Sequence, residues 1–141
     1  MAQGDVTVFD EAILAIHNAV HDFDTDSFLV FYTSATPTAG TTSPTKADFT
    51  EVSGGNFPVG GTASTLTAVN SAGTTTLDCT TNLSHAKDPT NPADIKYAVL
   101  YNASKADQCV LFVEIDAAGA DGTLGLISLT WGANIWTSQQ A

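Results

Sequence analysis

Apolar and polar residues form distinct blocks along the chain, and the clearest apolar block runs from Ile95 to Asp116. Two runs rich in Val, Tyr, Leu, Ile and Phe flank the short polar segment Asn102–Gln108, a pattern typical of an antiparallel β-hairpin. Both arms carry apolar residues on both faces, so each face needs cover, as in a sandwich or in a sheet backed by a helix. We therefore expect this hairpin to form the core of the fold.

A second apolar pattern predicts one helix near the start of the chain, within Asp5–Asp22. After the apolar lead Val6–Phe9, apolar residues recur at spacings of four, three and four, which aligns them on one side of a helix. Acidic residues in the first turn and histidines toward the end complement the helix macrodipole. The apolar stripe is predicted to lie on a sheet face, and it consists of Phe9, Ile13, Ile16 and Val20.

Other apolar runs predict strands. Ser27–Tyr32 has the bulky composition of a buried strand, and a second hairpin is predicted with its turn at Ser71–Gly73. The arms of that hairpin are Thr62–Asn70 and Thr74–Thr80, and a last pair of short strands is Leu126–Trp131 and Ile135–Thr137.

Two stretches are predicted to be connections. Ser34–Thr62 is rich in Thr, Pro, Gly, Ala and Ser, and so long a loop in a compact domain is typical of a contact region, so we expect partner contacts there. Asn82–Asp94 contains Pro89 and Pro92, which disfavour a helix through it.

The length and composition predict a single domain. The chain has 141 residues, of which 43% are hydrophobic, so residues 1–141 are expected to form one mainly β domain. Its predicted form is an antiparallel β-sandwich or barrel-like domain with one N-terminal α-helix packed on a sheet and long Thr/Gly/Pro-rich loops.

The charge composition counts against several classes of function. The chain has 15 acidic residues against four lysines and no arginine, with a formal net charge of −11. Nucleic-acid binding needs clustered Lys and Arg, so no nucleic-acid partner is expected. The missing arginine also counts against nucleotide binding and phosphoryl transfer. Charged residues make up only 13% of the chain, below the roughly 25% of an average soluble protein. Such a composition suits a surface covered by neighbours, and it also occurs in Thr-rich extracellular β domains.

The chain shows no address for export or for a membrane. No basic and apolar leader follows Met1, and no apolar run approaches the ~18 residues of a membrane-spanning helix. We expect a soluble protein that is made in a cytoplasm and has no membrane partner. Cys79 and Cys109 are accordingly expected to be reduced thiols, although a disulfide between them is the alternative.

Candidate metal ligands and catalytic groups are few. Asp22, Asp24 and Asp26 resemble the start of a calcium loop, but the positions that need Gly and Glu hold Ser27 and Thr33. A solvated connection is the preferred interpretation.

The histidines and one carboxylate pair give no stronger signal. His17 and His21 stand four apart, yet no Glu follows the first and no third ligand is evident, so we interpret them as surface histidines at a helix end; His85 stands alone. Glu114 and Asp116 share a strand face and form the best carboxylate pair, with a solvated or interface edge as the preferred interpretation. We therefore predict no catalytic, cofactor-binding or metal-binding residue, no cofactor, and no enzyme activity.

Aromatic residues leave one alternative open. Trp131 and Trp136 stand five apart, and Tyr97 and Tyr101 stand four apart. A carbohydrate-binding platform has such residues, but core packing and subunit contacts use the same pattern.

Three stretches in order resemble a family of small virion structural proteins of tailed bacteriophages. They are GDVTVFDEAILAIHNAVHDFDTDSFLVFY (4–32), FTEVSGGNFPVGGTASTLTAVNSAGTTTLDC (49–79) and IKYAVLYNASKADQCVLFVEID (95–116). The initial GDVTVF, the VHD before the first strand, the EVSGG-then-VGG pattern and YAVLYN carry the resemblance. Thr36–Ala47 departs from the family pattern by being poorer in hydrophobic residues.

The resemblance implies a capsid decoration (cement) protein on the outside of the phage head, made in the host cytoplasm. Its expected partners are the major capsid protein and further copies of itself, as a trimer or dimer. Alternatives are a tail, adaptor or neck component of the virion or, from a different class, a carbohydrate-binding module that uses Trp131 and Trp136.

Overall fold

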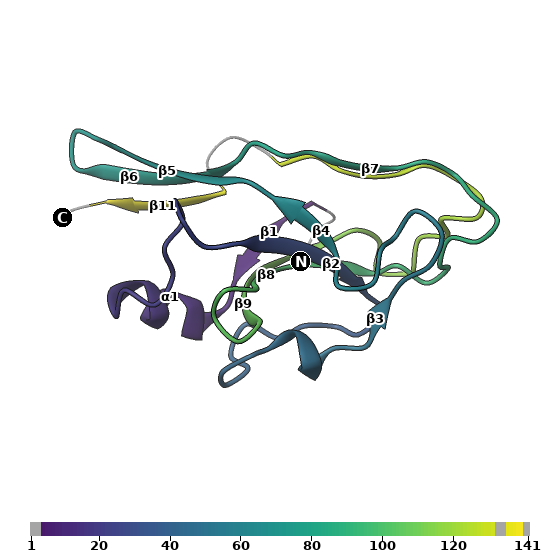
Figure 1. Ribbon diagram of the computed structural model, residues 1–141, viewed down its shortest axis with the longest axis horizontal. Helices are drawn as coiled ribbons and strands as arrows, with labels where there is room; N and C mark the ends of the chain where they lie inside the picture. The colour runs from purple at the N-terminus through teal and green to yellow at the C-terminus, as the bar shows by residue number, and fades with distance from the viewer. Residues whose placement is uncertain (1–3, 132–134, 140–141) are drawn as a thin grey trace.

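The two apolar runs at 97–114 form the centre of an antiparallel sheet, in a computed structural model that describes residues 4–131 and 135–139 (Figure 1). Strand β8 (Tyr97–Asn102) pairs with β9 (Gln108–Glu114), with Val99 opposite Phe112. All of β8 and the central five residues of β9 are buried. The predicted core hairpin is confirmed.

Four further strands complete this main sheet. β2 (Phe28–Thr33) pairs with the free side of β8, and β1 (Val6–Val8) pairs with the free side of β9. β3 (Glu51–Val52) pairs with the end of β2, and β4 (Thr62–Ser64) pairs with its beginning. The strand order is β1-β9-β8-β2-β3, with β4 also on β2.

A second antiparallel layer lies beside the main sheet, along the top of the view in Figure 1. It contains β5 (Leu66–Ser71), β6 (Thr74–Cys79) and β11 (Trp136–Gln139) in the order β11-β6-β5, together with the pair β7 (Leu83–His85) and β10 (Ile127–Leu129). We call the β5–β6 hairpin the arm; its turn lies at the end of the layer away from β7 (Figure 1). Two antiparallel layers with one short helix confirm the predicted mainly β class.

Large apolar side chains from both layers and from the chain start fill the core. Phe9 packs on Phe112 with ring centroids 4.9 Å apart, and Phe31 meets Tyr101 edge to face at 5.7 Å. The largest fully buried apolar side chains are Phe9, Phe31, Phe57, Phe112, Ile95, Leu100, Leu111, Val30, Val99, Val110 and Val113.

The predicted helix exists, but its predicted buried stripe is wrong. Helix α1 (Asp10–His17) begins after Phe9, whose backbone is extended, so Phe9 reaches the core from outside the helix. The helix then approaches β9 through its small residues, which leaves Ile13 39% exposed and Leu14 54% exposed. The buried helical residues are Ala12 and Ala15, whereas Ile16 and Val20 are half-buried. The predicted polarity of the helix is confirmed for Asp10 and Glu11 in the first turn and for His17 in the last, but His21 lies beyond the helix.

The long segment Ser34–Thr62 is folded against the main sheet. It contains strand β3 and the 3-10 helix η1 (Lys46–Asp48). A capping box between Thr45 and Asp48 stabilises the beginning of η1. Phe49 packs 6.1 Å from both Phe9 and Phe31 by ring centroids.

The two predicted last strands exist as β10 and β11; β10 pairs with β7, and β11 pairs with β6. Two other strand predictions need correction. Asn82–Asp94 is not only a connection, because Leu83–His85 forms β7. The first arm of the predicted second hairpin divides into β4 and β5, which belong to different sheets.

Both cysteines are free thiols, as predicted, and both are buried. Burial raises the pKa of Cys79, and it raises the pKa of Cys109 to about 12. Within the described ranges, no helix has the length and apolar character that crossing a membrane requires.

Candidate functional site

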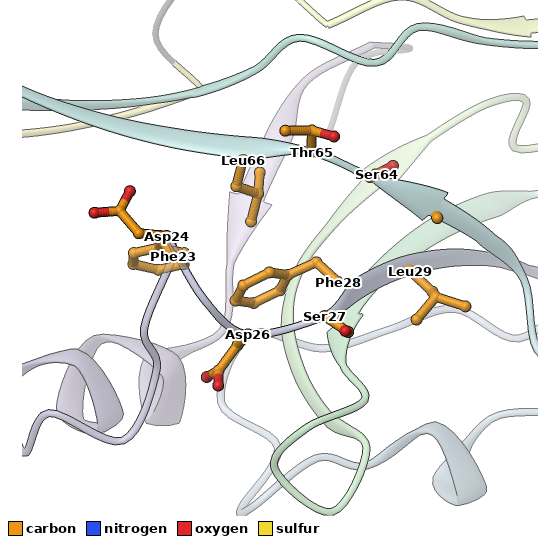
Figure 2. Close-up of a pocket in the computed structure, with 10 residues that line it drawn as sticks. Phe23, Asp24, Asp26, Ser27, Phe28, Leu29, Ser64, Thr65 and Leu66 are labelled. Atoms are coloured by element: carbon orange, nitrogen blue, oxygen red, sulfur yellow. The ribbon is translucent and has the colours of Figure 1, made fainter.

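A groove of about 380 Å³ lies between the α1–β2 connection and the strands β4 and β5 (Figure 2). Phe23 and Phe28 form its apolar part, with stacked rings 5.4 Å apart, and Leu66 faces them from β5. The carboxylates of Asp24 and Asp26 lie on the connection side. The remaining lining residues are Ser27, Leu29, Ala63, Ser64 and Thr65.

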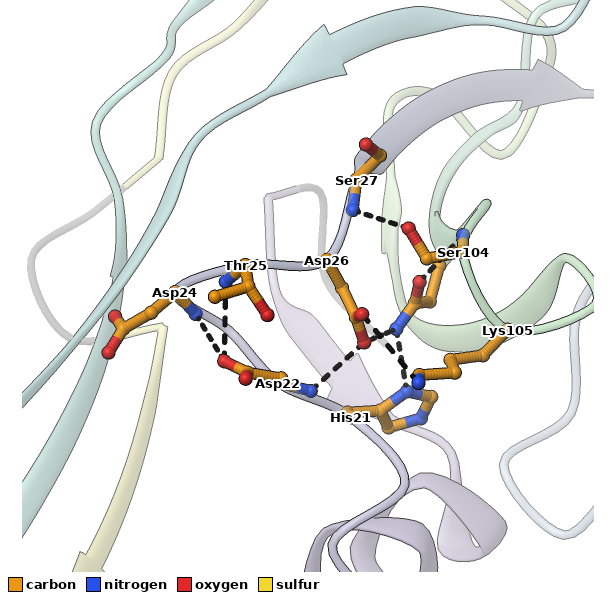
Figure 3. A network of polar contacts seen from close by, with 9 residues as sticks. His21, Asp22, Asp24, Thr25, Asp26, Ser27, Ser104 and Lys105 are labelled. Atoms are coloured by element: carbon orange, nitrogen blue, oxygen red, sulfur yellow. Dashed lines mark hydrogen bonds and ion pairs between the residues drawn. The ribbon is translucent and has the colours of Figure 1, made fainter.

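A polar network centred on Asn102 holds the connection beside this groove. Figure 3 shows its partners His21, Asp26 and Ser104. The fully buried amide of Asn102 donates from Nδ2 to Oδ2 of Asp26 at 2.7 Å and to Nδ1 of His21 at 3.1 Å. Its Oδ1 accepts from the backbone N–H of Ser104 at 2.9 Å, which fixes the amide orientation. Nδ1 of His21 is therefore an acceptor, and the neutral ring carries its proton on Nε2.

The charges in this network are already partnered. Asp26 accepts from the backbone N–H of Asp22 and from Asn102, and these bonds hold the pKa of its carboxyl below its usual range. Lys105 lies 3.8 Å from Asp26 Oδ1. Burial lowers the pKa of His21, with Asp26 acting in the opposite direction. The network ties the α1–β2 connection to the β8–β9 turn, which suits a supporting role for the groove rather than proton transfer to a ligand.

The aspartates that resemble a calcium loop are used to shape the connection. Asp22 Oδ1 accepts from the N–H groups of Asp24 and Thr25, at 3.0 and 3.2 Å. Asp26 turns instead toward Asn102. Among the described residues, no group of three or more His, Cys, Asp or Glu side chains could hold a metal ion.

The histidines are not brought together by one helix. His17 ends α1 and is exposed, as predicted, with Nδ1 2.8 Å from the carbonyl oxygen of Ile13. The prediction of a surface position is wrong for His21, which lies beyond the helix and is only 7% exposed. Asn102 bonds to its ring, and the rings of Phe23 and Phe28 lie beside it. His85 is buried in the second layer, where it donates to the Asn56 carbonyl oxygen and accepts from the Tyr32 hydroxyl.

The candidate carboxylate pair is divided by the end of a strand. Glu114 is the last residue of β9 and accepts from the Tyr97 hydroxyl at 3.4 Å, whereas Asp116 follows the strand and accepts from the N–H of Ala118.

The candidate sugar-binding aromatic residues whose side chains are described are buried. Tyr97, Tyr101 and Trp131 are each at most 8% exposed, and Trp131 donates from Nε1 to the Thr81 carbonyl oxygen. The side chain of Trp136 lies outside the described part of the chain. Tyr97, Tyr101 and Trp131 therefore do not form the exposed platform that sugar binding needs.

No protein-family model, curated protein or solved structure matches the chain.

Exposed apolar side chains mark further candidate contact surfaces. Val59, in the long segment Ser34–Thr62, is 80% exposed, and Leu124 and Leu126 in the loop before β10 are 74% and 62% exposed. Val69 on the arm is 53% exposed.

Sequence reasoning missed Asn102 because a single amide at the end of an apolar run has no distinctive pattern. The one available signal was its place at the start of the predicted polar turn, where side chains commonly bond to nearby backbone groups.

Proposed function

We propose that this protein is a phage virion structural protein that decorates the outside of the capsid and stabilises the shell. The observation that carries the proposal is the resemblance of three stretches, in order, to small virion structural proteins. Those stretches contain the strands β1, β3, β4, β8 and β9 of the main sheet in full, and β2 except for its last residue, Thr33. The resemblance thus coincides with the elements that define the fold.

The folded long segment supports the proposal because it offers a stable contact surface. The N–H of Lys46 bonds to the Asp107 carbonyl oxygen and the N–H of Cys109 bonds to the Pro44 carbonyl oxygen, so the segment is fastened to the β8–β9 hairpin. Val59 projects from the same segment into solvent. A contact residue on a fixed backbone loses little conformational freedom when a partner covers it.

The proposed mechanism is mechanical. Each subunit makes modest contacts with the major capsid protein and with neighbouring copies, and many linked contacts act together because each one raises the effective concentration of the next. The acidic surface is compatible with a position outside the DNA-filled shell, where no contact with phosphate is needed.

The experiment is to prepare particles that lack the protein, challenge them with heat or a chelator, and then add the purified protein back. The proposal predicts that depleted particles open at a lower temperature and that addition restores them. Particles that are equally robust without the protein would refute the stabilising role.

A pair of variants tests whether Ser34–Thr62 takes part. Val59→Asp leaves the fold intact because the side chain is exposed, and it is expected to weaken binding to depleted particles about tenfold or more by placing a charge in the contact. Leu14→Asp places the same charge on the exposed side of α1 and is the matched control. Equal binding by both variants would exclude Val59 from the contact.

A further inference from the structure

Strand β5 has a second edge that no strand occupies within residues 4–131 and 135–139. β5 is the last strand in the order β11-β6-β5. The turn residues Ala72 and Gly73 both have positive φ, 50° and 79°, as a two-residue type I′ turn requires. In such a hairpin Ser71 and Thr74 form the first hydrogen-bonded pair, and bonded pairs then alternate along the strands.

This alternation fixes which backbone groups of β5 point outward. Val69 pairs with Thr76 and bonds to β6, whereas Ala68 and Asn70 direct their N–H and C=O groups away from β6. The bond from the N–H of Thr80 to the Thr65 carbonyl oxygen follows the same alternation beyond the strand. The arm therefore presents a ready edge for one more antiparallel strand.

Within the described residues, the exposed part of this edge lacks the sequence features that usually protect against strand pairing. Soluble proteins guard such edges with lysine, proline, a bulge or a covering loop. The exposed residues Ala68 to Ser71 include neither lysine nor proline, and the β5–β6 register is unbroken. Val69 is 53% exposed on this strand.

Charge favours a second copy of the chain as the occupant of this edge. No charged residue occurs between Glu51 and Asp78, so all 15 carboxylates lie outside this stretch. Two copies, each with a formal charge of −11, repel each other over most of their surfaces. Strand β5 and the turn that follows it are the part of the chain where two copies can approach with least repulsion, and they carry no charge that would attract a basic partner.

We propose that two copies pair antiparallel through β5 about a twofold axis at Val69. In this register Ala68 of each copy lies opposite Asn70 of the other, and both exchange backbone hydrogen bonds across the axis. Val69 of one copy lies opposite Val69 of the other in a non-hydrogen-bonded pair. Side chains approach most closely in such pairs, and apolar side chains there stabilise a sheet. This pairing is a property of the free protein and does not depend on capsid binding, so either proposal can fail alone.

The first test is disulfide cross-linking with matched variants. Val69→Cys places two thiols across the axis at a Cα separation of about 4.5 Å, which a disulfide can span. Val59→Cys is the control because Val59 is more exposed, at 80% against 53%. The native thiols are buried and give little background. Under mild oxidation, Val69→Cys is expected to form covalent dimers at least tenfold faster than Val59→Cys. Equal rates would overturn the proposal.

The second test is sedimentation of the wild type and Ala68→Pro. Proline at position 68 removes an N–H that β6 does not use, so the arm can fold, but the pairing bond is lost and the ring obstructs the edge. We expect a wild-type dimer whose dissociation constant falls as salt is added, because salt screens the acidic repulsion, and a monomeric Ala68→Pro with unchanged circular dichroism. A wild type that is monomeric at both low and high salt, or a dimer that survives Ala68→Pro, would overturn the proposal; if Ala68→Pro does not fold, the cross-linking rates decide.

Discussion

Replacing Asn102 by alanine tests whether its network holds the groove side of the molecule together. The side chain has no solvent exposure and makes three hydrogen bonds, to Asp26, His21 and the backbone of Ser104. At about 1 kcal/mol net for each bond, Asn102→Ala is expected to reduce the free energy of unfolding by about 3 kcal/mol. The loss is large against the roughly 5–15 kcal/mol total that is typical of a domain.

Asn70→Ala is the matched control. Asn70 is exposed and its side chain makes one described bond, to Thr75 Oγ1 at 2.8 Å, so its loss is expected to cost about 0.5 kcal/mol or less. The assay is urea unfolding followed by far-UV circular dichroism, with the slope of each curve compared to the wild type. If Asn102→Ala costs no more than Asn70→Ala, the network does not stabilise the fold and this reasoning is wrong.

Four further predictions address the helix, a close backbone contact, the buried histidines and the thiols. Ala12→Leu is expected to destabilise by about 2 kcal/mol in thermal unfolding through overpacking, whereas Ile13→Ala costs about 0.5 kcal/mol; the reverse order would restore the predicted stripe. Gly60 and Gly61 both have positive φ, but of the two only Gly61 would bring an added Cβ against the Val30 carbonyl. Gly61→Ala is therefore expected to lower the free energy of unfolding in urea clearly more than the ~1 kcal/mol expected for Gly60→Ala. Equal losses would refute the close contact. Burial lowers the pKa of both His21 and His85, so the unfolded chain binds more protons below its own histidine pKa of about 6.5. The stability that these two buried histidines contribute is therefore fully present above pH 6.5 and is lost as the pH falls from 6.5 toward their lowered pKa values. His17→Gln, at an exposed position, is the control and is expected to leave this pH dependence as it is in the wild type. A melting temperature that stays constant from pH 7.5 to 5.5 would contradict this. Neither Cys79 nor Cys109 is expected to react with a thiol reagent before unfolding, and rapid modification of the native protein would contradict their burial.

Much of the fold followed from local pattern. The core hairpin was predictable because two long apolar runs flank one polar turn, and the arm was predictable because Ala72-Gly73 interrupts two Thr-rich runs. The division between β4 and β5 was not, because a strand that leaves one sheet for another keeps the same composition and period. β7 was missed because a three-residue strand between two connections is too short to show a pattern.

The helix error has a physical source. The apolar spacing that begins at Phe9 assumed that Phe9 belongs to the helix, but its backbone is extended and only the next residue starts α1. Close packing on β9 then selected the small side chains of Ala12 and Ala15, which periodicity based on large residues overlooks.

The site was less predictable than the fold. Its parts are far apart in the chain: His21 and Asp26 come from one connection and Asn102 from the end of β8. Their meeting depends on the pairing of β2 with β8, which sets Phe28 opposite Asn102. Nothing in the spacing of these residues encodes that register.

The most direct test of the central claim is to image virions assembled with and without this protein and to subtract one reconstruction from the other. The account predicts difference density on the outer surface of the head, repeated at symmetry-related positions across the capsid lattice. Density confined to the tail or neck, or no difference at any position, would contradict it.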